Sequence, residues 1–276
     1  MKTILVPTDF SNNANNALVF ANSIAKKLNA KIILLYIYEP TISKSNPISG
    51  LIAEEIVSAK NNAEKKIKAL ASKYITVNYK SIIEVHDPVE TILLASSKLK
   101  VDLIVMGTHG ATGLKKVIFG SNTSNVIAKA KVPVLAIPQG YKSLKIDKII
   151  CTSDLWNIDK ELKAISPIAK ALGTVIEVIY LDFGWEKELK PAQHFNAAIK
   201  KLRNKKIYLT RIKSSVEDRM VDVIQRSVNK SKNALFTMFP EKLNFIERIF
   251  IGSKTEQIAK GLKMPLLSIR KENLKK

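Results

Sequence analysis

A run of glycines between two apolar segments is the part of this sequence best suited to holding a ligand through the backbone. Residues 101–124 read VDLIVMGTHGATGLKKVIFGSNTS, with the spacing G-x2-G-x9-G-S at Gly107, Gly110, Gly120 and Ser121. Glycines at a strand end let a ligand approach the backbone closely. Ser121 can cap a following helix, whose free N–H groups and positive dipole end suit a phosphate. The position between a strand and a helix strengthens a motif that is weak by itself.

Each of these residues also has an interpretation without a ligand. The glycines can serve a tight turn, and Asp9 can be a turn or helix-capping carboxylate. His109 lies inside the loop and can touch a phosphate. No carboxylate stands beside it in sequence to orient it as a base, so we interpret it as a solvent-facing loop histidine.

The elements that must position the loop alternate between apolar runs and helical patterns. We expect strands at residues 4–6, 31–38, 77–85, 103–106 and 132–137, with helices between them. Ser11 and Asn29 mark the ends of the first helix, Pro88 begins a later one, and the strand at 77–85 reads as an exposed edge. The alternation predicts an α/β fold with a parallel sheet covered by helices on both faces.

The pattern then restarts, which indicates a tandem duplication with domains at residues 1–140 and 145–276. Residues 148–154 echo the opening strand, and Asp154 falls on Asp9. In the second copy Phe239 replaces Gly107 and Lys242 replaces Gly110, whereas the Gly-Ser pair at 252–253 remains. A phenylalanine side chain would fill the space for a nucleotide, so we expect the second domain to bind none.

Composition narrows the class of protein. The chain has 276 residues, a formal net charge of +21 and one cysteine, Cys151. The charge is mostly lysine spread over helix faces, with few arginines and no interleaved aromatics, so we expect a solvated surface and no nucleic acid partner. Without a signal peptide or a long apolar run, we expect a cytoplasmic protein with no membrane partner.

These residues resemble the universal stress protein family, over essentially the whole chain as two tandem domains. The first copy carries the family's ATP-type glycine signature and the strand-end Asp9 in VPTDFS. The resemblance implies two open parallel five-stranded sheets with strand order 3-2-1-4-5 and the nucleotide between the ends of strands one and four. Such a sheet reverses direction there, and ligands bind at that crevice. It also implies that the last strands, at 134–137 and 266–269, pair within the chain as a pseudo-dimer. The sequence leaves open whether two chains also form a homodimer.

The resemblance further implies a role for each candidate residue. Phosphates would be held by the loop and the helix start, Gly107 would admit the ribose and first phosphate, and Asp9 would face the ribose or a phosphate-bound Mg2+. The ends of strands one and two would line the adenine slot. The full set of cofactor-binding residues is Pro7, Thr8, Asp9, Ile37, Met106, Gly107, Gly110, Gly120, Ser121 and Asn122.

Several functions remain compatible with this sequence. We expect an ATP-binding, nucleotide-dependent stress-response regulator or adaptor. The alternatives are a slow ATPase or phosphotransfer enzyme, and a nucleotide-free interaction protein with a vestigial loop. Because we find no convincing base and no Walker lysine, we assign no catalytic residue.

Overall fold

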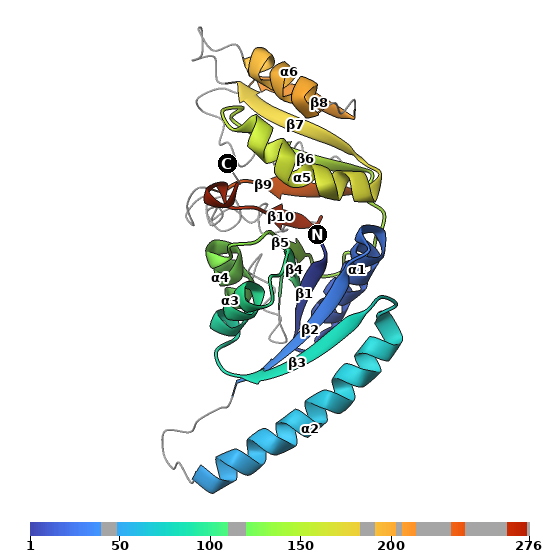
Figure 1. Ribbon diagram of the computed structural model, residues 1–276, viewed down its shortest axis with the longest axis vertical. Coiled ribbons are helices and arrows are strands. Elements are labelled where there is room, and N and C mark those ends of the chain that lie inside the picture. The colour runs from blue at the N-terminus through green and yellow to red at the C-terminus, as the bar shows by residue number, and fades with distance from the viewer. Residues whose placement is uncertain are drawn as a thin grey trace, which may run out of the picture. The chain divides into compact units, whose positions relative to one another are not determined.

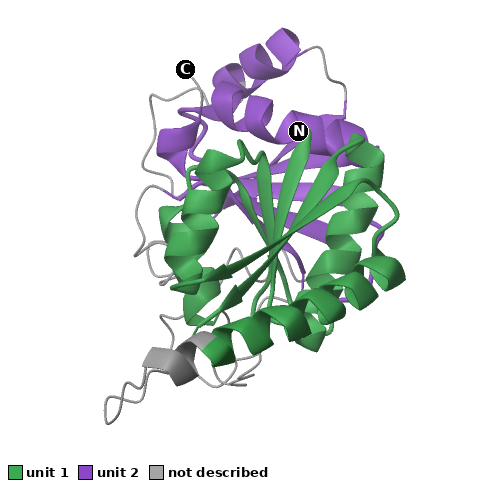
Figure 2. Cartoon of the chain, turned by 60° about the horizontal axis from the view of Figure 1, so that its bottom comes forward, with its two compact units in different colours: residues 1–115, 119–140 green, residues 116–118, 141–276 purple. Residues whose placement is uncertain are grey.

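The computed structural model (Figure 1) describes residues 1–39, 49–109, 120–182, 191–202, 206–213, 233–240 and 264–274. The chain forms two compact units that divide between Gly140 and Tyr141 (Figure 2). Each unit is an α/β fold with a parallel sheet, as the alternation of strands and helices predicts.

Unit 1 contains five strands: β1 (Thr3–Thr8), β2 (Lys31–Tyr38), β3 (Tyr79–Val85), β4 (Leu103–Gly107) and β5 (Val134–Ile137). Their parallel pairings run β3-β2-β1-β4-β5, the order that the resemblance implies. Strands β1, β4 and β5 are almost entirely buried, whereas β3 is half exposed along one edge. Because β1 and β4 lie side by side, the residues that follow them meet at one end of the sheet.

Four helices cover the sheet of unit 1: α1 (Asn12–Leu28), α2 (Ser49–Tyr74), α3 (Pro88–Lys98) and α4 (Ser121–Lys129). Helix α1 packs with α2, and α3 packs with α4. The two pairs flank the sheet on opposite sides (Figure 2). The predicted ends of α1 are confirmed: Ser11 accepts a hydrogen bond from the Ala14 N–H, and Asn29 adopts a left-handed backbone with φ 50°.

Unit 2 repeats this plan with β6 (Lys148–Thr152), α5 (Ile158–Leu172), β7 (Val175–Asp182), α6 (Pro191–Leu202), β8 (Ile207–Lys213), β9 (Ala234–Met238) and β10 (Leu266–Ser268). The pairings run β8-β7-β6-β9-β10, all parallel. A short 3-10 helix, Lys271–Asn273, follows β10. Strand β8 is an element that the sequence patterns did not predict.

The same turn ends the first strand of each unit. In unit 1 the Thr8 hydroxyl accepts from the Phe10 N–H and Asp9 Oδ1 accepts from the Ser11 N–H, at 3.1 and 2.9 Å. In unit 2 the hydroxyl of Ser153 and Oδ1 of Asp154 accept from residues 155 and 156 in the same way, at 2.9 and 3.0 Å. Phe10 and Leu155, at the centres of these turns, have φ of 64° and 66°. The duplication therefore extends to individual hydrogen bonds.

Across the described parts of the chain, none of the helices combines the length and apolar character needed to cross a membrane.

Candidate functional site

A cavity of about 250 Å³ opens at the carboxyl ends of β1 and β4 in unit 1. Nine of the ten predicted residues line it, although they come from four separate stretches of sequence. Gly110, the tenth, lies outside the described residues. The nine are Pro7, Thr8, Asp9, Ile37, Met106, Gly107, Gly120, Ser121 and Asn122.

The same cavity is lined by residues that the sequence analysis did not assign to it. These are Ala14, Leu35, Pro88, Ile92, His109 and Thr123. The position of Leu35 could have been predicted from the sequence, because Leu35 lies two residues before Ile37 in a strand and therefore points to the same face of the sheet. Pro88 and Ile92 come from the start of α3. No sequence pattern indicated that they line the cavity, because only the folded chain places that helix there.

The start of α4 faces the cavity without a side-chain cap. The N-cap residue is Gly120, which makes no side-chain hydrogen bond to the helix, and the first turn holds no acidic residue. Our expectation that Ser121 caps this helix is therefore wrong: Ser121 is already the first helical residue. The first N–H groups of a helix have no partner within the helix and carry its positive dipole end. Because Gly120, Ser121 and Asn122 line the cavity, this positive end of α4 faces it.

Hydrogen bonds join the end of β4 to its neighbour β5 and to the start of α4. The buried Thr123 hydroxyl donates to the Gly107 carbonyl at 2.8 Å. The Thr108 N–H donates to the Ile137 carbonyl at 3.0 Å, and the Thr108 carbonyl accepts from the Gly120 N–H at 2.7 Å. These contacts fix the uncapped helix start relative to the end of β4.

Asp9 has the turn role that its alternative interpretation predicts. Its Oδ1 accepts from Ser11, and Asp154 makes the equivalent contact in unit 2. Asp9 also lines the cavity and is exposed there. Burial, with a smaller contribution from the negative charge of Asp9, raises the pKa of Tyr36. The described residues contain no group of three or more His, Cys, Asp or Glu placed to hold a metal ion.

His109 lies against the cavity, which differs from our expectation of a histidine facing bulk solvent. Its Nδ1 lies 2.9 Å from the Thr108 hydroxyl, and its backbone carbonyl accepts from Asn13 Nδ2 at 2.9 Å. The first contact comes from the segment that leaves β4, and the second comes from α1.

The position of unit 2 that corresponds to Gly107 carries a phenylalanine. Leu103 lies beside Ile4 and Leu235 beside Ile149, and this shared register puts Phe239 where unit 1 has Gly107. Phe239 is buried. Beside it in sequence, the Pro240 carbonyl accepts from the Lys271 N–H, and Lys271 Nζ lies 2.9 Å from Asp154 Oδ2. The residues at 242 and 252–253 lie outside the described residues.

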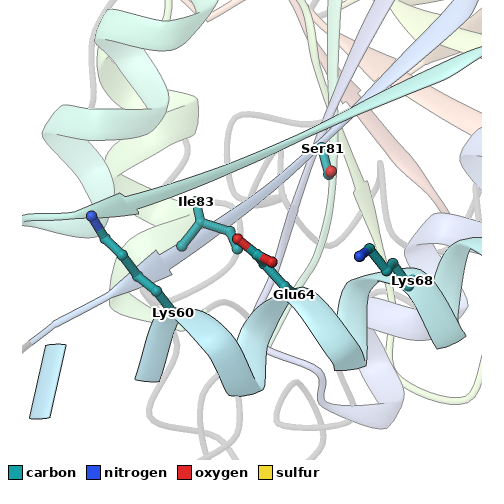
Figure 3. Close-up of a pocket in the computed structure, with 5 residues that line it drawn as sticks. All are labelled: Lys60, Glu64, Lys68, Ser81 and Ile83. Carbon is teal, nitrogen blue, oxygen red and sulfur yellow. The ribbon is translucent and has the colours of Figure 1, made fainter. Parts of the chain in front are cut away.

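A second hollow lies between α2 and β3 on the flank of unit 1 (Figure 3). Lys60, Glu64 and Lys68 extend from α2 toward Ser81 and Ile83 of β3. The three charged residues are spaced four apart, so each lysine is a helix neighbour of Glu64 and the pattern stabilises α2 itself. None of the predicted site residues lines this hollow.

Comparisons with known proteins agree with these features. Residues 1–138 match the model of the universal stress protein family. A universal stress protein of Methanocaldococcus jannaschii is 33% identical over 144 residues, covering 51% of this chain and 84% of that protein. The crystal structure of a universal stress protein from Archaeoglobus fulgidus matches 98% of both chains at 19% identity, with a TM-score of 0.69. Another universal stress protein, solved in complex with cAMP, is 26% identical over 49% of this chain and 96% of its own, with a TM-score of 0.36.

Proposed function

Because this chain belongs to the universal stress protein family, we propose that it is an ATP-binding member in which unit 1 holds the nucleotide. In this proposal nucleotide occupancy changes how the protein engages a partner, so the protein acts as a stress-response regulator or adaptor. The residues that touch the nucleotide are those of the cavity at the ends of β1 and β4.

The uncapped start of α4 is the observation that carries the proposal. A helix start that lacks a side-chain cap and has no acidic residue in its first turn attracts an anion, and here it lines a cavity at the point where the sheet reverses direction. Apolar residues at the other wall, Ile37, Leu35 and Ile92, suit the face of an adenine base. The cavity thus combines the positive end of a helix with apolar side chains, as an adenine nucleotide requires.

The phosphates would lie against Gly120, Ser121 and Asn122, together with Gly110 from the loop. Asp9 would then lie near the ribose or near a Mg2+ that arrives bound to the phosphates. A hard cation of this kind is usually held by one or two carboxylates plus the substrate phosphates.

The direct test is to extract nucleotide from gently purified protein and then titrate the emptied protein with Mg·ATP by calorimetry. We expect bound adenine nucleotide and a saturable heat with ATP. A protein that is purified empty and gives no heat with ATP, ADP or cAMP would contradict the proposal and favour a nucleotide-free interaction protein. A time course of phosphate release on the same samples would detect slow hydrolysis.

A pair of charge variants on α4 tests the location of the phosphates. Asn122 lines the cavity, whereas Asn125 is exposed on the same helix and is absent from the residues that line the cavity. Asn122→Asp adds a negative charge beside the phosphates, so we expect ATP affinity to fall by about tenfold or more. The matched control Asn125→Asp adds the same charge one turn later and is expected to bind ATP nearly as the parent does.

The melting temperatures of the two variants show whether a loss of ATP affinity reflects unfolding. An aspartate in the first turn of a helix favours the helix dipole, so Asn122→Asp is expected to keep or slightly raise the melting temperature. A folded Asn122→Asp protein with unchanged ATP affinity would place the phosphates elsewhere.

We also propose that β5 and β10 pair within the chain. Each pairs with a neighbour on one side, β4 and β9 respectively, and each is short and apolar. An exposed apolar edge favours association, and pairing the two would remove both edges. Sedimentation equilibrium is expected to give a monomer; a stable dimer would favour pairing between chains.

We also propose that the protein is located in the reducing environment of the cytoplasm. Cys151 is free and fully buried, and burial strongly raises the pKa of its thiol. Thiol labelling of the folded protein is expected to be slow, and rapid labelling would contradict this placement of Cys151.

A further inference from the structure

We propose that Asn13 is a positioning residue of the nucleotide site, and that Gly107 is a glycine because of Asn13 and not because of the ligand. The first part rests on the proposed function, whereas the second is a property of the fold alone. Neither role follows from the glycine spacing, since Asn13 lies on α1, outside the glycine-rich stretch.

Asn13 is the second residue of α1, and its side chain is 5% exposed. Its Nδ2 donates to the His109 carbonyl at 2.9 Å. Its Oδ1 is buried and has no hydrogen-bond partner among the described residues. The donor Nδ2 therefore sets the orientation of the amide, because the reverse orientation would place two oxygens against each other.

This amide lies in the space that a side chain at position 107 would need. A Cβ added to Gly107 would stand 2.5 Å from Asn13 Nδ2 and 2.9 Å from Asn13 Cγ, and 3.1 Å from the Asn13 carbonyl oxygen. Non-bonded carbon atoms prefer separations of about 3.5–4.0 Å, so the first two contacts are steric clashes.

The backbone of Gly107 gives no other reason for a glycine. Gly107 is the last residue of β4 and pairs with Ile137. Among the described glycines, only Gly140 and Gly173 have positive φ. Position 107 thus has a conformation that any residue can adopt, and what excludes a side chain there is the Asn13 amide.

The contact joins the two walls of the cavity. On one side, Asn13 lies in the first turn of α1, which follows the turn in which the Ser11 N–H donates to Asp9. On the other side, it holds the carbonyl of His109, two residues after β4. Thr123 of α4 holds the Gly107 carbonyl of the same segment. The chain leaving β4 is therefore fixed between α1 and α4, which sets the spacing between Asp9 and the α4 N-terminus.

The experiment compares Asn13→Ala, Gly107→Ala and the double variant in the whole protein. Overpacking a dense site usually costs a folded protein stability, so Gly107→Ala is expected to lower the melting temperature by roughly 5 °C. Asn13→Ala removes both a hydrogen-bonded N–H and a buried unpaired oxygen, so its own effect is expected to be smaller. In the double variant most of the loss is restored, because only the contact with the Asn13 carbonyl remains.

Asn13→Leu combined with Gly107→Ala is the matched control. Leucine branches as asparagine does and, like alanine, lacks the side-chain N–H, so the clash remains and the melting temperature is expected to stay low. If the alanine and leucine double variants behave alike, space at Asn13 does not decide position 107 and the inference is wrong.

Titration with Mg·ATP then separates positioning from ligand contact. We expect Asn13→Ala to weaken ATP binding about fivefold, because one tether between the cavity walls is lost. The alanine double variant is expected to bind ATP as Asn13→Ala does. If it folds but binds no ATP while Asn13→Ala still binds, the nucleotide itself requires Gly107 and the inference is overturned. If the parent protein binds no nucleotide, the proposed function is wrong. The melting temperatures of the variants still test whether the Asn13 amide excludes a side chain at position 107.

Discussion

Glu161, on α5 of unit 2, is a buried carboxyl group whose charge state is coupled to folding. Its side chain is 1% exposed, the Ser153 hydroxyl donates to its Oε2 at 2.5 Å, and its Oε1 has no hydrogen-bond partner in the described part of the chain. Burial raises the pKa of Glu161 to about 7; the Ser153 hydrogen bond opposes this shift, and Asp154 adds to it. Lys271 also opposes the rise and Asp159 supports it.

The pKa shift predicts that stability falls with rising pH. The pKa of Glu161 is about 7 when folded and 4.5 ordinarily, so between these values the unfolded chain releases a proton that the folded chain retains. The free energy of unfolding therefore decreases from about pH 4.5 to 7, by up to roughly 3 kcal/mol. Urea denaturation of the parent and of Glu161→Gln, at several pH values between 5 and 8, checks this. We expect the glutamine variant to lose most of the slope.

Glu177→Gln is the control for this prediction. Burial favours the neutral acid at Glu177, but hydrogen bonds from Lys148 and Thr210 outweigh it and lower the pKa of Glu177. Its stabilisation is lost only as pH falls below the ordinary range of a glutamate, so the slope between pH 5 and 8 is expected to persist. An equal loss of slope in both variants would mean that Glu161 is not the titrating group.

Three helices of unit 1, α1, α3 and α4, begin in two different ways. Helices α1 and α3 are capped by the side chains of Ser11 and Asp87. Helix α4 begins at Gly120 with no such cap. A capping side chain satisfies N–H groups that would otherwise be available to a ligand. The first turns of α1 and α3 also reach the cavity, through Ala14 and Pro88, so among these three helix starts α4 is the one without a side-chain cap.

Removal of a cap is expected to cost stability at α3. Asp87 accepts from the Glu90 N–H at 2.8 Å, so Asp87→Ala is expected to lower the free energy of unfolding by about 1 kcal/mol. Ser97→Ala, at an exposed position on the same helix, is the control and is expected to change it little. Urea titration at neutral pH measures both. Equal stability of the two variants would mean that the cap contributes nothing measurable.

At the scale of the molecule, two copies of one fold have diverged at the same crevice. Unit 1 has a cavity between the ends of β1 and β4, with Gly107 at its base. Unit 2 has a buried Phe239 at the matching position and an ion pair between Asp154 and Lys271 nearby. Side chains that fill a site and pair its charges leave no room or attraction for a phosphate.

We therefore expect one nucleotide per chain. Calorimetry with Mg·ATP is expected to give a stoichiometry near one, and Asn122→Asp is expected to weaken that single event. Phe239→Gly, which opens space in unit 2, is expected to leave the stoichiometry unchanged because the Asp154–Lys271 pair remains. A stoichiometry near two in the parent would contradict the assignment of unit 2 as nucleotide-free.

The sequence by itself determined the features that depend on local chemistry. Apolar periodicity predicted most strands and helices, Ser11 and Asn29 marked the ends of α1, and the echo of the opening strand at residues 148–154 indicated the duplication. Nine of the ten residues that the family resemblance implies line one cavity, in keeping with parallel strands that bring their carboxyl ends to one edge of a sheet.

Only the tertiary structure decided how distant segments meet. In the folded chain Pro88 and Ile92 of α3 line the cavity, and so does His109. The N-cap residue of α4 is Gly120 and not Ser121. The tertiary structure also placed the Asn13 amide against Gly107, 94 positions away along the chain. Contacts of this kind depend on packing across the fold, whereas periodicity and capping patterns report only on neighbours within one element.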